Sequence, residues 1–302
     1  MPEIEFSDRV AIVTGAGAGL GRDYALQLGK RGAKVVVNDL GGARDGTGAG
    51  KTAADQVVDE IKAAGGQAVP NYDDVSTTAG GENIVKTALD HFGKVDILIN
   101  NAGILRDKTF VKMEENSWDA VLNVHLKAAY NVTRPAFINM RQNQYGRIIL
   151  TSSVAGVMGN FGQANYGAAK MGLCGLTNVL KLEGAKYNIN VNVILPSAGT
   201  RMTDDVMPPE MFERLKVEYI TPAVLYMCSE QFRETGLYIN AYAGYFSRSA
   251  ILTGPGVAFK DLPTPEQIKE NWDKIVDMGD AKYYEHVNEF MADVLGGKGL
   301  IG

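Results

Sequence analysis

Cysteine and histidine are scarce in this sequence of 302 residues, which contains two cysteines and three histidines. Cys174 and Cys228 are too few for a disulfide framework, and their spacing matches neither a redox motif nor a zinc motif. None of the histidines is paired with another at a helical spacing. The sequence therefore predicts no metal site.

Excess positive charge and long apolar runs are also lacking. The 30 basic and 35 acidic residues give a net charge of −5, so we expect no nucleic-acid partner. No apolar run approaches the roughly 18 residues of a membrane span, and the acidic N-terminus has no secretory apolar core. The C-terminus carries no peroxisomal tripeptide. We expect a cytoplasmic protein without membrane association.

Glycine, by contrast, is abundant, with 35 residues against 10 prolines and no collagen-like period. The 45% hydrophobic and 22% charged fractions are typical of a folded globular chain, so the glycines do not indicate disorder. They indicate places where the backbone turns tightly or approaches something closely.

Short β-branched runs alternate with segments of helical periodicity along most of the chain. The expected strands are 10–14, 34–39, 67–69, 95–100, 147–151, 191–195 and 237–241, and the expected helices are 20–30, 53–64, 84–91, 118–140 and 166–187. Continuously apolar strands between helices indicate a parallel sheet covered on both faces. The sequence predicts an α/β fold with a doubly wound parallel sheet of about seven strands.

The alternation ends after residue 241. We expect residues 1–245 to form the main domain and residues 246–302 to form a short helical C-terminal extension, with helices near 266–276 and 282–294. About 60 residues are few for an independent core, so we expect the extension to pack on the main domain.

A glycine-rich stretch, TGAGAGLG at 14–21, follows the first expected strand and opens a helix. Glycine there lets the backbone approach a pyrophosphate, whose charge is favoured by free N–H groups at a helix N-terminus. Any tight strand-to-helix turn can use glycine, but the strand before it and the helix after it favour a nucleotide site. We assign Gly15, Gly19, Leu20 and Gly21 to cofactor binding.

The second expected strand ends at Asp39, 18 residues after Gly21. A carboxylate here can accept hydrogen bonds from an adenosine ribose and would repel a 2′-phosphate, although an Asp at a strand end can also simply cap a turn. With the glycine turn, Asp39 predicts NAD (NADH) rather than NADP. Residues 40–52 end in Gly-Lys-Thr, but Asp45 occupies a position where a phosphate-binding loop needs glycine. We interpret this segment as a flexible surface loop.

Three residues form a candidate catalytic set. Tyr166 and Lys170, four residues apart, share one face of an expected helix, so the ammonium can lie near the phenol. A neighbouring cation lowers the pKa of a tyrosine from about 10 toward the range of a general base. Ser153 follows a strand end and could hydrogen-bond the substrate oxygen. An ordinary Tyr/Lys pair on a solvated helix face would have the same spacing.

These residues resemble the short-chain dehydrogenase/reductase family over residues 7–245. The matching elements are TGAGAGLG at 14–21, Asp39, Asp74-Val75, NNAG at 100–103, Ser153, YGAAK at 166–170, and Pro196 with Thr200. The resemblance implies a Rossmann-type NAD-binding domain. In it, Asp74 and Val75 would contact the adenine and Asn101 the centre of the cofactor. Tyr166 would be the base, and Lys170 would also hold the nicotinamide ribose. Thr200 lies in the segment that would close near the nicotinamide amide.

One position departs from the family pattern. The family has V-N-L in the helix after NNAG, whereas this chain has His125 there, and Asn123 lies two residues earlier. The fourth catalytic member is therefore open: the imidazole could serve, a water could replace it, or His125 could be a structural core residue.

Other stretches narrow the resemblance. VVVNDLGG, NNAGILRD, NFGQANY and PTPEQIKENWDKI are similar to the (3R)-hydroxyacyl-CoA dehydrogenase domains of type 2 multifunctional enzymes of peroxisomal β-oxidation, which share V-H-L. The resemblance implies a free-standing relative that interconverts (3R)-3-hydroxyacyl-CoA and 3-oxoacyl-CoA with NAD. The alternatives are a broad-specificity or steroid-type alcohol/ketone dehydrogenase and a non-catalytic NAD-binding regulator.

A subunit interface is also expected. Small residues, among them Gly172 and Gly175, recur along the expected helix 166–187, and small residues let helices approach closely. In the family this helix joins subunits, so we predict a homodimer or homotetramer.

Overall fold

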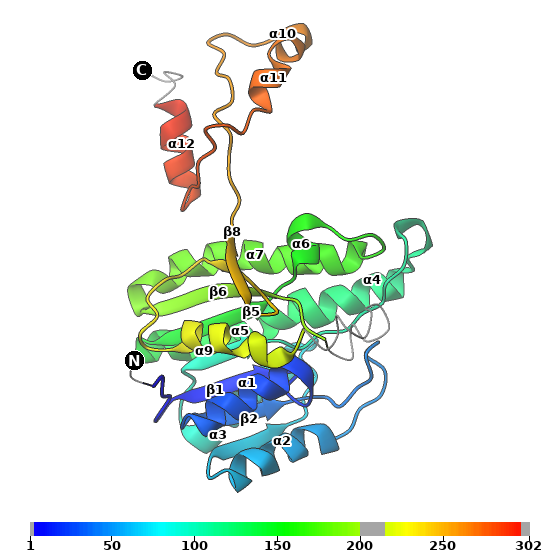
Figure 1. Ribbon diagram of the computed structural model, residues 1–302, viewed down its shortest axis with the longest axis vertical. Coiled ribbons are helices and arrows are strands. Elements are labelled where there is room, and N and C mark those ends of the chain that lie inside the picture. Colours follow the sequence, from blue (N-terminus) through cyan, green and yellow to red (C-terminus); the bar gives the residue numbers. More distant parts are fainter. Residues whose placement is uncertain (1–2, 200–214, 297–302) are drawn as a thin grey trace. The chain divides into compact units, whose positions relative to one another are not determined.

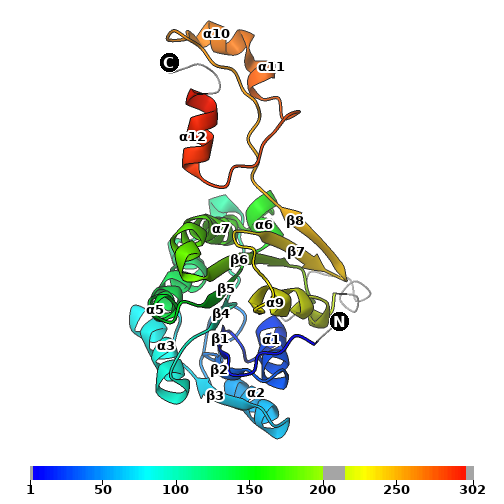
Figure 2. The same cartoon turned by 90° about the vertical axis from the view of Figure 1, so that its left-hand side faces the viewer.

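The computed structural model describes residues 3–199 and 215–296 and divides the chain into two compact units, residues 1–248 and 249–302. Within the described residues, eight strands form one sheet in the order β3-β2-β1-β4-β5-β6-β7-β8 (Figure 1, with every strand labelled in Figure 2). The strands are β1 (Val10–Thr14), β2 (Lys34–Asn38), β3 (Gln67–Asn71), β4 (Ile97–Asn100), β5 (Gly146–Thr151), β6 (Ile189–Pro196), β7 (Tyr238–Tyr242) and β8 (Tyr245–Ser249). Strands β1 to β7 pair in parallel, which confirms the predicted Rossmann-type sheet.

Helices cover both faces of this sheet (Figure 2). The first core layer contains α1 (Gly19–Lys30), α2 (Thr52–Ala63) and α9 (Thr221–Cys228), and the second contains α3 (Thr78–Phe92), α5 (Ala128–Asn143) and α7 (Ala164–Gly184). The strands between the layers read as continuous apolar runs because both of their faces are buried. All five residues of β1 are buried, for example.

The expected helix 118–140 is longer and is interrupted by a π-helical turn. It consists of α4 (Glu115–Leu122), the π-helical turn η2 (Asn123–Lys127) and α5. A π-turn adds one residue to a helical turn, and such turns are frequent at functional sites. A short helix, α6 (Val154–Met158), follows β5.

Strand β8 was not predicted. It is a mostly exposed strand, YFSRS, that adds an eighth member to the sheet. Ala243 and Gly244, both with positive φ (48° and 80°), make a two-residue turn between β7 and β8. Such a turn joins antiparallel strands, so β8 runs against its neighbour. Hydrophobic periodicity does not predict β8, because an exposed strand at the edge of a sheet needs no regular pattern of apolar side chains.

The second unit contains α10 (Pro265–Glu270), α11 (Trp272–Ile275) and α12 (Val287–Leu295). A capping box between Thr264 and Gln267 starts α10. The expected helix 266–276 is divided at Asn271, and the later helix begins at Val287 rather than at 282. The division of the chain at residue 245 and the packing of the extension on the main domain stay predictions.

Because β1 to β7 are parallel, all of them begin on one side of the sheet and end on the opposite side. We call the side where they begin the amino edge and the side where they end the carboxyl edge.

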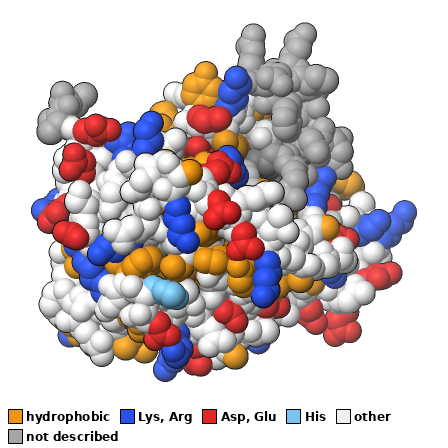
Figure 3. All heavy atoms as spheres, turned by 90° about the horizontal axis from the view of Figure 1, so that it is seen from below, with side chains coloured by type: hydrophobic (Ala, Val, Ile, Leu, Met, Phe, Trp, Pro, Cys, Tyr) orange, Lys and Arg blue, Asp and Glu red, His pale blue; other side chains and the backbone are white. Residues whose placement is uncertain are grey.

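On the face in Figure 3, acidic and basic side chains are interspersed over the described part, with a band of hydrophobic side chains between them. In the described ranges, no helix has the length and apolar character to cross a membrane. Among those same residues, no group of three or more potential metal ligands comes together.

Candidate active site

The glycine turn after β1 is built for close approach at the carboxyl edge. Gly15 and Gly19 have positive φ values of 62° and 55°. A Cβ on Gly21 would lie 2.2 Å from Gly15 O, so α1 can pack under the turn only with glycine there. Ala18 precedes α1 without a side-chain cap. The N–H groups of the first turn of α1 therefore suit an anion such as a pyrophosphate.

Asp39 lies at the end of β2 beside this turn. Its Oδ2 accepts a hydrogen bond from Gly17 N (2.7 Å), and its Oδ1 accepts one from Gly41 N (2.7 Å). The carboxylate thus connects the glycine turn with the loop that follows β2. Each oxygen keeps a further lone pair for ribose hydroxyls.

The structure brings the predicted cofactor residues together around one cleft of about 390 Å³, which we call the carboxyl-edge cleft. The predicted residues that line it are Gly15, Gly19, Leu20, Asp39, Asp74, Val75 and Asn101. Gly21 is buried beneath the turn, and Thr200 lies outside the described residues. The cleft opens where the sheet order reverses, between β1 and β4, as ligand sites do in doubly wound folds.

Asn101 fixes the turn as well as lining the cleft. Its Nδ2 donates to Thr14 O and to Gly15 O, both at 3.1 Å, and its backbone N donates to Thr14 Oγ1 at 3.0 Å. Asn131 similarly donates from Nδ2 to Val75 O at 3.0 Å. The supporting roles of Thr14 and Asn131 leave no signal in the sequence, because both contacts join residues more than 50 positions apart.

Ser153, Tyr166 and Lys170 meet beyond the end of β5. Ser153 precedes α6 and accepts a hydrogen bond from Ala155 N at 3.1 Å, and it also hydrogen-bonds the Tyr166 hydroxyl. Lys170 Nζ donates to Thr151 O at 2.5 Å and lies 5.4 Å from the centre of the Tyr166 ring. The i, i+4 spacing on α7 therefore places the cation beside the phenol, as predicted.

Burial dominates the ionisation of this group. It raises the pKa of Tyr166 to about 12, against the opposing effect of the Ser153 hydrogen bond. Burial also lowers the pKa of Lys170 to about 7. The raised pKa of Tyr166 is opposite in direction to the lowering expected from a neighbouring cation. The reason is that Lys170 is buried with a single hydrogen bond to a described residue and loses much of its own charge near neutral pH.

His125 lies in η2, directly against Tyr166. The two rings meet edge to face with centroids 5.2 Å apart. Nε2 lies 2.8 Å from Ile104 O and 3.1 Å from Ile104 N, so it hydrogen-bonds that backbone in either tautomer. Burial, and to a smaller extent the nearby charge of Lys170, lowers the pKa of His125 well below its usual value, so the ring is neutral. A Cβ on Gly103 would lie 2.4 Å from Cε1, which explains the glycine of NNAG.

The other ring nitrogen is buried without a hydrogen-bond partner among the described residues. The same holds for Thr151 Oγ1. His125, Thr151 and Lys170 all line a small internal cavity of about 10 Å³, which is room for roughly one water. Asn123, two residues before His125, lines the carboxyl-edge cleft instead.

Comparison with known proteins settles the family. The family model described as short chain dehydrogenase matches residues 9–210. The chain belongs to the short-chain dehydrogenase family. It is therefore an oxidoreductase, and the family assignment and the Rossmann-type fold predicted from the sequence are both confirmed.

Some of the proteins that this chain is similar to are longer than it. Peroxisomal multifunctional enzyme A of Dictyostelium discoideum is 53% identical over 97% of this chain and 65% of its own length. The structure of full-length peroxisomal multifunctional enzyme type 2 from Drosophila melanogaster has 41% identity and a TM-score of 0.83, over 98% of this chain and 50% of that one. A 7α-hydroxysteroid dehydrogenase complexed with NADH and 7-oxo glycochenodeoxycholic acid has 28% identity and a TM-score of 0.72, over 80% of this chain and 95% of that one. The chain thus spans 65% and 50% of the length of these two multifunctional relatives.

Proposed function

We propose that this chain is an NAD-dependent dehydrogenase that interconverts (3R)-3-hydroxyacyl-CoA and 3-oxoacyl-CoA. The observation that carries the proposal is the meeting of Ser153, Tyr166 and Lys170 beyond the strand end, near a cleft whose turn suits a dinucleotide. The similarity to multifunctional enzymes over nearly the whole chain supports the acyl-CoA substrate.

In the oxidation direction, Tyr166 takes the proton of the substrate hydroxyl while Ser153 hydrogen-bonds and orients the same oxygen. NAD⁺ bound in the carboxyl-edge cleft would supply the nicotinamide that accepts the hydride. Burial raises the pKa of Tyr166 to about 12, and the hydrogen bond with Ser153 opposes that rise and so favours the phenolate. Lys170 donates a hydrogen bond to Thr151 O. Because the pKa of Lys170 is about 7, its side chain can give up and take back a proton near neutral pH and so exchange one with Tyr166.

We assign His125 a positioning role at the end of this proton path. Its neutral ring packs on Tyr166, and its unpartnered nitrogen borders the small cavity that Lys170 also lines. A single water in that cavity would connect Lys170 with His125. This assignment combines two of the alternatives considered from the sequence, the imidazole and the water.

For the cofactor, we propose NAD rather than NADP. The family binds NAD(H), and the preference rests on Asp39, whose carboxylate is fixed beside the glycine turn by the N–H groups of Gly17 and Gly41. A 2′-phosphate on the adenosine ribose would meet this negative charge. A cytoplasmic location stays a prediction, and the multifunctional relatives are peroxisomal by name.

We propose a homodimer or homotetramer formed through α7. Val179 and Leu182 on this helix are about half exposed, and Gly175 has open space where a Cβ would lie. Gly172 has a different reason, since a Cβ there would meet Leu126 at 2.8 Å within the chain. Light scattering at micromolar concentration should give a dimer or tetramer, and a monomer would overturn this part.

The test of the main proposal is steady-state kinetics over a panel of CoA thioesters and free ketones, each with NADH and NADPH. We expect strong turnover of 3-oxoacyl-CoA with NADH and weak turnover with NADPH. Strong turnover of free ketones or steroids and weak turnover of thioesters would favour the alternative, a broad-specificity or steroid-type dehydrogenase, which the likeness to the hydroxysteroid dehydrogenase supports. Cofactor binding without turnover of any substrate would favour the regulator.

A further inference from the structure

The loop of residues 41–50, which we call the strap, is closed at its base. Gly50 N donates to Leu40 O at 2.9 Å. A Cβ on Gly41 would lie 2.0 Å from Gly50 O, and Gly41 has a φ of +75°, so only glycine allows the two ends to meet this closely. The strap therefore leaves and rejoins the fold at nearly one point, as an Ω-loop does.

The tip of the strap is an ordered turn. Ala43 N donates to Thr47 O at 2.7 Å, and Gly46 N donates to Ala43 O at 3.0 Å. The Asp45 carboxylate accepts hydrogen bonds from Thr47 Oγ1 (2.7 Å) and Thr47 N (2.9 Å), which lower the pKa of Asp45. These bonds are local to residues 43–47, so the tip is held together by its own contacts.

The tip docks on the segment that follows β4, about 60 residues away in sequence. Leu105 N donates to Arg44 O at 3.1 Å, and Arg106 Nε donates to Asp45 O at 2.9 Å. Gly46 packs closely on Ile104, because a Cβ on Gly46 would lie 3.1 Å from Ile104 Cγ2. Two hydrogen bonds and one apolar contact therefore attach the tip to this segment.

The strap forms part of the wall of the carboxyl-edge cleft. Gly42, Ala43, Arg44 and Gly46 line the cleft together with Asp39, Asp74 and Val75. Asp39 also binds the first residue of the strap through its hydrogen bond from Gly41 N. A ribose held by Asp39 would thus lie directly beside the strap.

We propose that the strap encloses the adenosine end of the bound dinucleotide and that Arg106 is the positioning residue that fastens it, a proposal that rests on the proposed NAD site. Release of the dinucleotide then requires the contacts of the strap with Arg106 and Ile104 to break. The glycines of residues 41–50 serve this closure: Gly41 at the base and Gly46 at the docking contact.

The first test removes the fastening side chain. Arg106→Ala loses the bond to Asp45 O, and we expect the rate constant of NADH dissociation, measured by stopped-flow displacement, to rise about tenfold. The affinity for ADP-ribose, which occupies the same end, should fall by the same factor, and Arg106→Lys should recover part of the loss. Arg134→Ala, which removes an exposed arginine of α5, should leave both values and the melting temperature unchanged.

The second test uses two glycines with the same backbone strain. Gly46 and Gly65 both have a φ of +85°, but a Cβ at Gly65 meets nothing within 4 Å. Gly46→Ala should therefore speed NADH dissociation, whereas Gly65→Ala should not. Unchanged dissociation in both Arg106→Ala and Gly46→Ala, with NADH still bound, would overturn the strap proposal alone. No NADH binding by the wild-type chain would overturn the proposed function, and the strap proposal with it.

Discussion

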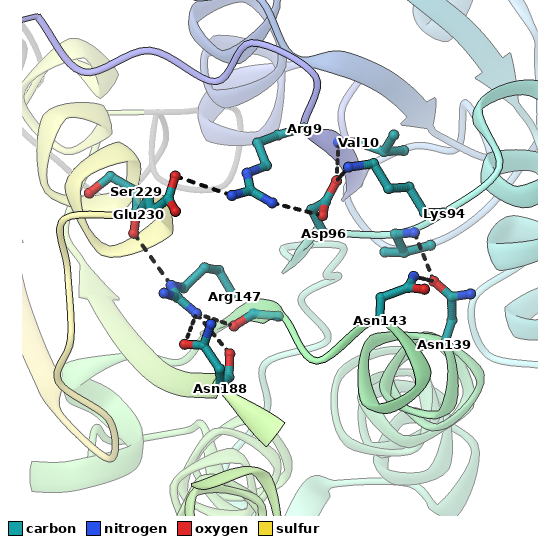
Figure 4. A network of polar contacts seen from close by, with 12 residues as sticks. Arg9, Val10, Lys94, Asp96, Asn139, Asn143, Arg147, Asn188, Ser229 and Glu230 are labelled. Atoms are coloured by element: carbon teal, nitrogen blue, oxygen red, sulfur yellow. Dashed lines mark hydrogen bonds and ion pairs between the residues drawn. The ribbon is translucent and has the colours of Figure 1, made fainter. Parts of the chain in front are cut away.

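The two edges of the sheet each bury a cation, and they surround it differently. At the amino edge, Arg147 is fully buried at the start of β5 (Figure 4). Its Nη1 donates to Gly146 O (2.8 Å) and Asn188 O (3.0 Å), and its Nε donates to Ser229 O (3.3 Å). The Tyr145 ring lies 4.5 Å away. Only Nη2 lacks a hydrogen bond to a described residue.

At the carboxyl edge, Lys170 is also buried, but the described residues give its ammonium one hydrogen bond, to Thr151 O. Burial lowers the pKa of both cations. A guanidinium stays charged because its pKa starts above 12, whereas the pKa of Lys170 reaches about 7. The difference teaches that a buried cation with many partners supports the fold, and one with few partners can exchange protons.

Removing one tyrosine hydroxyl at each edge gives the largest expected difference in kcat. Tyr166→Phe should lower kcat about a thousandfold because the proton acceptor is lost, with NADH affinity retained. Tyr145→Phe removes a hydroxyl from the amino edge and should leave kcat unchanged. NADH formation from a 3-hydroxyacyl-CoA measures both. Substantial turnover by Tyr166→Phe would show that Tyr166 is not the general base.

Replacing each cation by methionine should separate stability from catalysis. Arg147→Met should lower the free energy of unfolding by about 3 kcal/mol, because it leaves buried carbonyl oxygens without donors, and kcat should stay the same. Lys170→Met should lower kcat about a hundredfold without loss of stability. Urea unfolding and steady-state kinetics on both variants check this. Loss of stability in Lys170→Met with unaltered kcat would reverse the comparison.

His125 gives a smaller effect at the carboxyl edge. His125→Leu removes both ring nitrogens and should lower kcat about tenfold, whereas His125→Asn, which can still hydrogen-bond Ile104, should lose less. His91→Leu, on the exposed end of α3, serves as the control. Equal losses of kcat in Leu and Asn variants, with altered pH profiles in both, would make the imidazole itself part of the proton path.

The smallest effect is a pH dependence of stability. The pKa of Lys170 falls from 10.5 in the unfolded chain to about 7 in the fold, so between these values the unfolded chain binds more protons. The Lys170 contribution to stability therefore rises with pH across this window. Any advantage in melting temperature of cofactor-free Lys170→Met over wild type should shrink from pH 7 to pH 9. An advantage independent of pH would show that Lys170 keeps its proton throughout.

Local patterns predicted most of the fold and the catalytic set. The buried strands stand out because both faces need apolar residues, and β1 has the bounds expected from the sequence. Tyr166 and Lys170 were identifiable because four residues make about one helical turn. Strand β8 and the π-turn at His125 were not, because an exposed edge and an extra residue in a helix leave no periodic signal.

The sequence by itself determined the parallel α/β sheet, the glycine turn and the family, since these depend on side-chain periodicity and on motifs within a few residues. Tertiary structure alone decided the ionisation of Lys170 and Tyr166, because burial is contributed by elements distant in sequence. It also decided the role of residues 41–50, which the sequence indicated only as a flexible surface loop. Their contacts with Ile104, Leu105 and Arg106 exist only once β2 and β4 stand on either side of β1.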